Sequence, residues 1–229
     1  MKPKFIVVSG LIGVGKTHFT RQLATMLGFE AMFEPVKDNP YLAKFYEDPK
    51  TWAYPMQEHL KHRRFAAYQY GFWGIRCGAF QGVIMDRSIH EDTVFAQINN
   101  EAGNIHDLNW NTYLSGFQDF QAFLPEPDLY VFLDAPPETC RQRQLARDRP
   151  EERKMADDQT GGIPIEYMKR LHKGYMDWLD EIAPRVQVVR IDWTTFRDVE
   201  TAWNDARQQW EERGRFSRRL VHPPQEETA

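Results

Sequence analysis

An apolar run opens directly into a glycine-rich loop in Phe5-Ile6-Val7-Val8-Ser9-Gly10-Leu11-Ile12-Gly13-Val14-Gly15-Lys16-Thr17. Four of these residues match the phosphate-binding pattern G-x-x-x-x-G-K-[ST], namely Gly10, Gly15, Lys16 and Thr17. Glycine lets the backbone turn so tightly that successive N–H groups converge on phosphate oxygens, and Gly13 adds further freedom. The stretch therefore predicts a buried strand followed by a phosphate-binding loop around Val14.

The residues after the loop predict a helix that begins beside the phosphates. An apolar stripe at helical spacing is formed by Phe19, Leu23, Met26 and Leu27. Gly28 follows in the position of a left-handed cap. At the positive end of the helix dipole, Lys16 would supply a mobile cation for the β and γ phosphates, and the Thr17 hydroxyl would be a ligand for Mg²⁺. We therefore expect a nucleoside triphosphate with Mg²⁺ as the ligand.

The composition is typical of one α/β domain. The chain has 229 residues and a formal net charge of −4, which argues against a protein that binds duplex nucleic acid, because neutralising phosphates requires a basic face. Its two cysteines show no metal-binding or redox spacing, and no signal peptide or membrane-length apolar run is present. We expect a cytoplasmic protein with one domain over residues 1–222, a disordered tail over 223–229, and no nucleic-acid or membrane partner.

Charged side chains follow two of the expected strands at the point where each strand ends. Glu34 ends the second strand-like segment, and Asp86 with Arg87 ends the third. Strands that alternate with helices predict a parallel sheet, and the carboxyl ends of its strands open into one crevice. In that crevice Glu34 would act as a general base, Asp86 would hold Mg²⁺, and Arg87 would face the transferred phosphoryl group.

One face of a long helix expected over residues 57–79 could read a flat heterocycle. Gln57, Leu60 and Arg64 share this face because they are three and four residues apart. An amide and a guanidinium offer complementary hydrogen bonds to a base edge, with Leu60 between them. Asp92 could orient Arg64 through a charge-assisted hydrogen bond. The alternative is that Arg64 only extends to water.

The remaining elements are expected from periodicity and from helix breakers. The long helix is expected to be broken or weakened near Gly71 and Gly74. Residues 99–109 are polar and turn-rich, whereas residues 110–123 predict an aromatic helix that would serve a core or a dimer interface. Further elements are expected as strands over 128–134 and 186–191 and as helices over 164–182 and 196–210.

The most basic part of the chain holds five arginines within thirteen residues, namely Arg141, Arg143, Arg147, Arg149 and Arg153. Arg143 and Arg147 lie one helical turn apart, so that their guanidiniums can converge on one anion. A lid over a triphosphate, at about residues 141–162, would need this arrangement. The alternative is a solvated helix whose arginines pair with local acids.

Taken in order, these residues resemble the deoxyribonucleoside kinases, the family of deoxycytidine, deoxyguanosine and bacterial deoxyadenosine kinases. The resemblance covers most of the chain. Its motifs are the phosphate loop Gly10 to Thr17, Glu34-Pro35-Val36, Tyr46 with Gln57 eleven residues later, Arg64, Asp86-Arg87-Ser88 with Asp92, the arginine-rich lid, and Gly162-Ile163-Pro164-Ile165-Glu166-Tyr167. The resemblance implies a P-loop kinase fold, in which helices flank a central five-stranded parallel sheet, and a homodimer.

The resemblance also implies a role for each matching residue. Glu34 would take the proton of the nucleoside 5′-hydroxyl as that oxygen attacks the γ-phosphorus of ATP. The oxygens of the transferred group would be held by Lys16, Arg87, Arg147 and Arg149, and Mg²⁺ by Thr17 and Asp86. The sugar 3′-hydroxyl would be bound by Tyr46 and Glu152, and the base by Gln57, Leu60, Arg64 and Asp92. Arg143 would stack on the adenine of ATP.

The expected reaction is ATP-dependent phosphorylation of a deoxynucleoside in nucleotide salvage. Arg64 with Asp92 resembles the members that act on deoxyadenosine, deoxyguanosine or deoxycytidine rather than thymidine. Extra residues at 153–161 depart from the family pattern. A deoxynucleoside monophosphate kinase of the same fold is the alternative, although Glu34 would repel its dianionic acceptor. A non-catalytic nucleotide-binding module is a third possibility.

Overall fold

The computed structural model describes residues 4–34, 39–147 and 162–219, and within 213–219 it describes the helical backbone alone. Five parallel strands form one sheet in the order β2-β3-β1-β4-β5. This arrangement confirms the predicted α/β fold with a central five-stranded parallel sheet. The elements follow in the order β1 (Phe5–Gly10), α1 (Lys16–Leu27), β2 (Glu30–Met32), α2 (Leu42–Glu47), α3 (Pro49–Arg76), β3 (Val83–Asp86), η1 (Ile89–Glu91), α4 (Asp92–Glu101), α5 (Asp107–Ala122), β4 (Leu129–Asp134), α6 (Pro137–Arg147), α7 (Ile165–Ile182), β5 (Val188–Asp192) and α8 (Val199–Arg219).

The centre of the sheet is the most apolar part of the chain. All six residues of β1 and all four of β3 are buried, which is typical of strands covered on both faces. Val8 lies opposite Asp86 on one side and opposite Val131 on the other. Because the strands are parallel, their carboxyl ends meet at one edge of the sheet. The glycine-rich loop and Asp86 therefore lie together at that edge.

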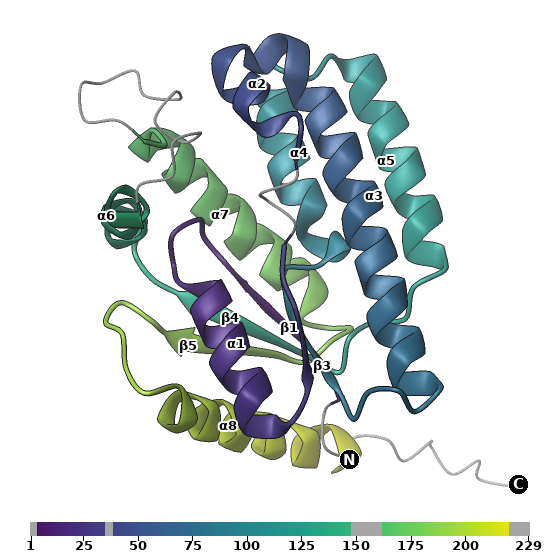
Figure 1. Cartoon of the computed structure of the whole chain (residues 1–229), viewed down its shortest axis with the longest axis vertical. Helices are drawn as coiled ribbons and strands as arrows, with labels where there is room; N and C mark the ends of the chain where they lie inside the picture. Colours follow the sequence, from purple (N-terminus) through teal and green to yellow (C-terminus); the bar gives the residue numbers. More distant parts are fainter. Residues whose placement is uncertain (1–3, 35–38, 148–161, 220–229) are drawn as a thin grey trace, which may run out of the picture.

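The helices form two groups around the sheet (Figure 1). In one group, α3, α4 and α5 stand side by side, and α7 contacts α4. In the other, α1 contacts β3, α8 contacts β5, and the two helices contact each other. In the part of the chain that the structure describes, no helix is long and apolar enough to cross a membrane.

Helix α3 corrects the expectation of a break near two glycines. The helix runs without interruption for 28 residues, from an N-cap at Asp48 through both glycines. A Cβ on Gly71 would lie 3.0 Å from the Met32 sulfur, and one on Gly74 would lie 2.1 Å from the Phe80 ring. The glycines are therefore contact points that admit neighbouring side chains, a role that their spacing in the sequence does not reveal.

The polar segment 99–109 is also more helical than expected. Helix α4 extends to Glu101, and α5 begins at Asp107. His106 caps α5, because its Nδ1 accepts a hydrogen bond from the Leu108 N–H at 3.2 Å. Asn99 stays within its helix by donating to the Phe95 carbonyl at 2.9 Å. Local hydrogen bonds thus allow polar residues to continue or start helices where composition suggested turns.

Candidate active site

The glycine-rich loop has the geometry of an anion-binding site. Gly15 has φ 110° and is the N-cap of α1, which has no side-chain cap, so the first N–H groups of the helix are open to a ligand. Gly13 has φ 83°, and a Cβ there would lie 2.3 Å from the Cys140 carbonyl oxygen of α6. Glycine is thus required both by the backbone conformation and by the close approach of α6.

Lys16 lies at the centre of this loop and is almost fully buried. Its Nζ donates to the carbonyl oxygens of Gly10 at 3.1 Å and of Leu11 at 2.8 Å. Burial lowers the pKa of Lys16 to about 8 and the nearby Arg87 adds to this effect, against the opposing pull of Asp86 and Glu34. The ammonium is therefore held on backbone carbonyls of the glycine-rich loop itself.

Thr17 and Asp86, the two residues expected to hold Mg²⁺, lie in direct contact. The Thr17 hydroxyl donates to Asp86 Oδ2 at 2.6 Å, across 69 residues of sequence. Asp86 Oδ1 is buried and has no hydrogen-bond partner among the described residues. Burial raises the pKa of Asp86, while Lys16 opposes this rise. Two oxygen ligands of this kind, one with an open coordination position, fit Mg²⁺, which binds through a few oxygens and keeps several waters.

Glu34 does not point into bulk solvent but lies between two guanidiniums. Arg64 Nη2 donates to Glu34 Oε1, and Arg87 Nε lies 3.2 Å from Glu34 Oε2. Burial favours the neutral acid, yet the charges of Arg64, Arg87 and Lys16 together prevail and hold the pKa of Glu34 at about 2. The carboxylate is thus ionised and lies close to both Lys16 and Arg87.

Arg87 has an uncommon backbone conformation. Its φ is 68°, the one positive φ of a non-glycine residue in the described ranges. Such a conformation costs about 1–2 kcal/mol for a residue with a Cβ and occurs most often at functional sites. Its Nη1 lies 3.3 Å from Glu91 Oε1 and also donates to the Tyr175 hydroxyl. Arg87 is consequently held at the strand end by groups from several elements.

Residues predicted to read a base line a polar interior face of α3. Arg64 Nη1 donates to Asp92 Oδ1 at the start of α4, which confirms the expected pairing. Three further atoms of this group are buried without a hydrogen-bond partner among the described residues, namely Gln57 Oε1, Arg64 Nε and Asp92 Oδ2. Buried polar atoms normally have hydrogen-bond partners, so these three atoms could still bond to a ligand. Tyr46 and Leu60 belong to a small apolar cluster around Phe45.

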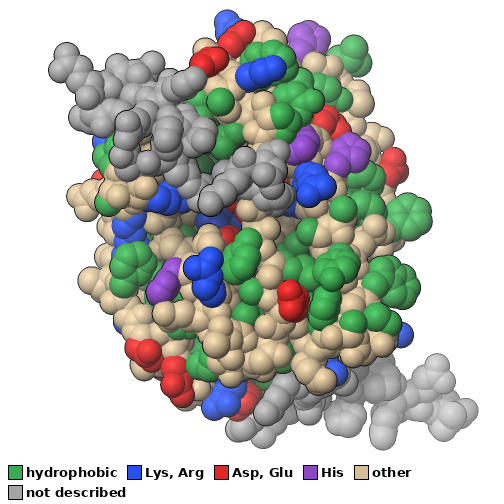
Figure 2. Space-filling view, viewed as in Figure 1, with side chains coloured by type: hydrophobic (Ala, Val, Ile, Leu, Met, Phe, Trp, Pro, Cys, Tyr) green, Lys and Arg blue, Asp and Glu red, His purple; other side chains and the backbone are tan. Residues whose placement is uncertain are grey.

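The arginine-rich segment is described only in part. Helix α6 carries Arg143 and ends at Arg147, and Figure 2 shows several Lys and Arg side chains in the part of the view where α6, α1 and the glycine-rich loop lie. Arg149, Glu152 and most of the predicted lid lie outside the described residues. Arg143 donates to the carbonyl oxygens of Val14 at 3.1 Å, Trp193 at 2.9 Å and Thr194 at 2.8 Å. Its guanidinium also lies 3.9 Å from the centre of the Phe196 ring. Arg143 therefore joins the phosphate loop to the segment before α8.

Two residues that the sequence did not single out complete the site. Glu91 lies four residues after Arg87 and could have been paired with it by spacing. Tyr175 lies on α7, within the helix expected over residues 164–182. Both are fully buried, and both contact the Arg87 guanidinium. The pairing of Tyr175 with Arg87 has no local signal, since 88 residues separate the two.

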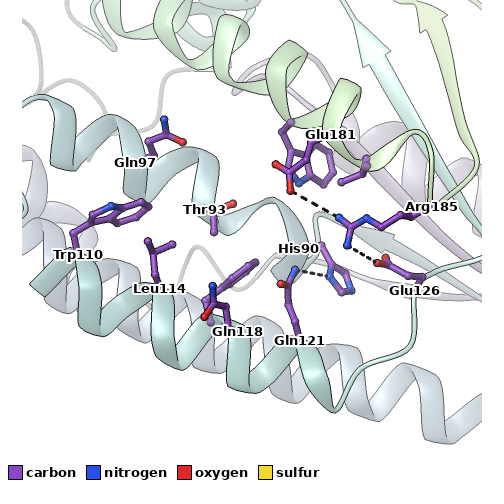
Figure 3. A pocket seen from close by; sticks show the side chains of 13 residues that line it. His90, Thr93, Gln97, Trp110, Leu114, Gln118, Gln121, Glu126, Glu181 and Arg185 are labelled. Carbon is purple, nitrogen blue, oxygen red and sulfur yellow. Dashed lines mark hydrogen bonds and ion pairs between the residues drawn. The ribbon is translucent and has the colours of Figure 1, made fainter.

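His90 lies behind the site and lines a separate cavity (Figure 3). Its Nδ1 lies 3.3 Å from the Gln121 amide nitrogen, and burial, with a contribution from Arg185, lowers its pKa to about 4. Burial thus keeps this histidine neutral at physiological pH. The cavity has a volume of about 290 Å³ and is lined from α4, α5, α7 and the turn after α7 by residues that include Thr93, Gln97, Trp110, Leu114, Trp178 and Arg185.

Solved structures share this fold. A deoxyadenosine kinase from M. mycoides, described with products dCMP and a flexible dCDP bound, superimposes with a TM-score of 0.75, covering 91% of this chain and 99% of that chain at 24% identity. The same protein, described with bound dATP, gives a TM-score of 0.73 over 88% of this chain and 98% of that chain. The P-loop kinase fold that the resemblance implied is confirmed.

Sequence comparisons identify the family. The family model described as deoxynucleoside kinase matches residues 6–213. A deoxyadenosine kinase of Dictyostelium discoideum is 37% identical over 85% of this chain and 74% of its own length. A deoxyadenosine/deoxycytidine kinase of Bacillus subtilis is 32% identical over 78% of this chain and 77% of its own. This agreement over most of each sequence, on a fold with an ionised carboxylate beside a phosphate loop, shows that the chain belongs to the deoxynucleoside kinase family.

Proposed function

We propose that this deoxynucleoside kinase uses Glu34 as the base that activates the 5′-hydroxyl of deoxyadenosine, deoxyguanosine or deoxycytidine for attack on the γ-phosphorus of ATP. The position of Glu34 between Arg64 and Arg87, close to Lys16, is the observation that carries the proposal. Phosphoryl transfer needs positioning and charge neutralisation more than covalent chemistry. The fixed carboxylate can position the attacking hydroxyl, and the cations beside it can neutralise charge.

Each residue of the site then has a defined task. Glu34 accepts the proton of the 5′-hydroxyl, while Lys16 and Arg87 neutralise oxygens of the transferred group. Arg147 and Arg149 add charge from the lid. Thr17 and Asp86 would hold Mg²⁺, which when bound neutralises charge on the β and γ phosphates.

The substrates are recognised by two further groups of residues. Tyr46 and Glu152 bind the sugar 3′-hydroxyl, and Arg143 binds the adenine of ATP. Gln57, Arg64 and Asp92 read the base, with Leu60 beside it, and their buried unpartnered atoms support this assignment. The relatives named for deoxyadenosine, deoxyguanosine and deoxycytidine support the same choice of bases.

Initial rates of ADP release test the proposed reaction. The substrates are the common deoxynucleosides, the matching ribonucleosides and the deoxynucleoside monophosphates, each with ATP and Mg²⁺. We expect the highest kcat/KM with deoxyadenosine, deoxyguanosine or deoxycytidine. A preference for thymidine would contradict the assignment of the base-reading residues, and faster turnover of monophosphates would contradict the role of Glu34.

The lowered pKa of Lys16 predicts that ATP binding depends on pH. With a pKa of about 8, Lys16 is mostly charged at neutral pH and loses its proton as pH rises through this value. We expect the affinity of the free enzyme for ATP to fall about tenfold between about pH 7 and pH 9. Isothermal titration calorimetry measures this change together with proton uptake. Lys16→Gln should bind ATP weakly with no such dependence, and equal affinities of the wild type at both pH values would refute the prediction.

We also propose that the kinase is a homodimer, as the family resemblance implies, and that it is cytoplasmic with one domain over residues 1–222. Light scattering on the purified full chain should give twice the mass of one chain. Dilution well below the assay concentration should leave this value unchanged. A mass of one chain at every concentration would contradict the dimer.

A further inference from the structure

The orientation of the Arg87 side chain matters in the proposed reaction because its guanidinium must face the transferred phosphoryl group. The strand that precedes Arg87 does not determine this orientation. Arg87 follows the last residue of β3 in a left-handed conformation. Its guanidinium lies between carboxylates on two sides, with Glu34 at 3.2 Å from Nε and Glu91 at 3.3 Å from Nη1. Either carboxylate can attract the guanidinium, so a further contact is needed to fix where the guanidinium lies between the two.

Tyr175 provides this contact from a separate element. Its side chain is fully buried on α7, and its hydroxyl accepts a hydrogen bond from Arg87 Nη1. The ring is held by aromatic neighbours, with centroid distances of 5.6 Å to Phe132, 6.0 Å to Phe95 and 6.1 Å to Trp178. A ring that is packed on several sides has one orientation, so its hydroxyl has a fixed position.

The same packing fixes the distance between α7 and the site. A Cβ on Gly174 would lie 2.9 Å from Val94 Cγ1 of α4, so the helices approach closely next to Tyr175. The Arg87 guanidinium carbon also lies 4.7 Å from the centre of the Phe95 ring, on the same helix α4. The guanidinium is therefore stacked on one aromatic ring and hydrogen-bonded to another.

We propose that Tyr175 is a positioning residue, whose hydroxyl holds the Arg87 guanidinium toward the transferred phosphoryl group. A phenol accepts one N–H without carrying a negative charge, so it orients the cation and leaves its charge for the phosphate. Glu34 and Glu91, in contrast, partly neutralise the charge of the Arg87 guanidinium. The inference rests on the proposed role of Arg87 in the reaction.

Tyr175→Phe tests this inference because it removes only the hydroxyl and keeps the ring. We expect kcat to fall about tenfold through misplacement of Arg87, with both KM values within about twofold of wild type. The matched control is Tyr68→Phe, which removes another buried hydroxyl, one that donates to the Pro125 carbonyl at 2.8 Å. The control should lose similar thermal stability and keep its kcat. An unchanged kcat for Tyr175→Phe, or equal losses in the two variants, would overturn the inference.

A double-mutant cycle separates positioning from general damage. In an Arg87→Lys background the ammonium lacks the guanidinium fork, so Tyr175→Phe should lower kcat by less than about twofold further. A full additional tenfold loss there would show that Tyr175 does not act through Arg87. Turnover by the wild type distinguishes a failure of the proposed function from a failure of the inference about Tyr175. A wild type that phosphorylates no deoxynucleoside refutes the proposed function, whereas an active wild type with an equally active Tyr175→Phe variant refutes only this inference.

Discussion

Replacing Glu34 by glutamine is expected to lower kcat about 1,000-fold, because a neutral amide cannot accept the proton of the attacking hydroxyl. Glutamine has nearly the shape of glutamate, and its one carbonyl oxygen can still accept a hydrogen bond from one of the two guanidiniums, which keeps the side chain in place. Substrate binding should therefore be affected much less than turnover. Steady-state kinetics with ATP and the preferred deoxynucleoside measure both quantities.

Glu30→Gln is the matched control for this variant. Glu30 is an exposed carboxylate on the short edge strand β2, four residues before Glu34. Its replacement changes the net charge by the same amount and should leave kcat near that of the wild type. If Glu34→Gln retained more than about a tenth of wild-type kcat, the carboxylate would not be the base.

Replacing Arg64 by leucine is expected to destabilise the protein by about 3–5 kcal/mol, the usual cost of breaking a buried ion pair by removing one partner. Arg64 contacts Glu34 and Asp92 at once, and Asp92 is fully buried. Without the guanidinium, Asp92 loses its cation and Glu34 keeps only Arg87. Denaturant unfolding at neutral pH measures the loss of stability. Arg63→Leu, at the exposed neighbouring position, should change it by less than about 0.5 kcal/mol.

The same variant should be less destabilised in acid. In the wild type the pKa of Glu34 is depressed to about 2 from its ordinary value of 4.5, so its favourable pairing is present above about pH 4.5 and is lost as pH falls through about 2. In Arg64→Leu the less compensated carboxylates take up protons more readily, which relieves their repulsion. The difference in unfolding free energy between the two proteins should therefore shrink below about pH 4.5. A loss under about 1 kcal/mol at neutral pH would refute the stabilising role of Arg64.

Most of the fold could be predicted because its signals are local. The glycine-rich loop needs particular backbone conformations, and the apolar runs of β1 and β3 suit only strands buried on both faces. The expectation failed for α3, where Gly71 and Gly74 were read as helix breakers. Whether a glycine breaks a helix or admits a neighbour depends on residues such as Met32 and Phe80 that pack against it.

In the candidate site, too, some features could be predicted from the sequence and others depend on the tertiary structure. Lys16, Thr17, Glu34, Asp86 and Arg87 could be named from the sequence, because each lies at or beyond the carboxyl end of a strand and parallel strand ends meet at one edge. The sequence by itself thus determined the chemistry of the chain and the edge of the sheet where it occurs. Only the tertiary structure decided that the pKa of Glu34 is about 2 and that Tyr175 holds Arg87. The physical reason is that such effects depend on the distances between charges and donors from different elements, and packing alone sets those distances.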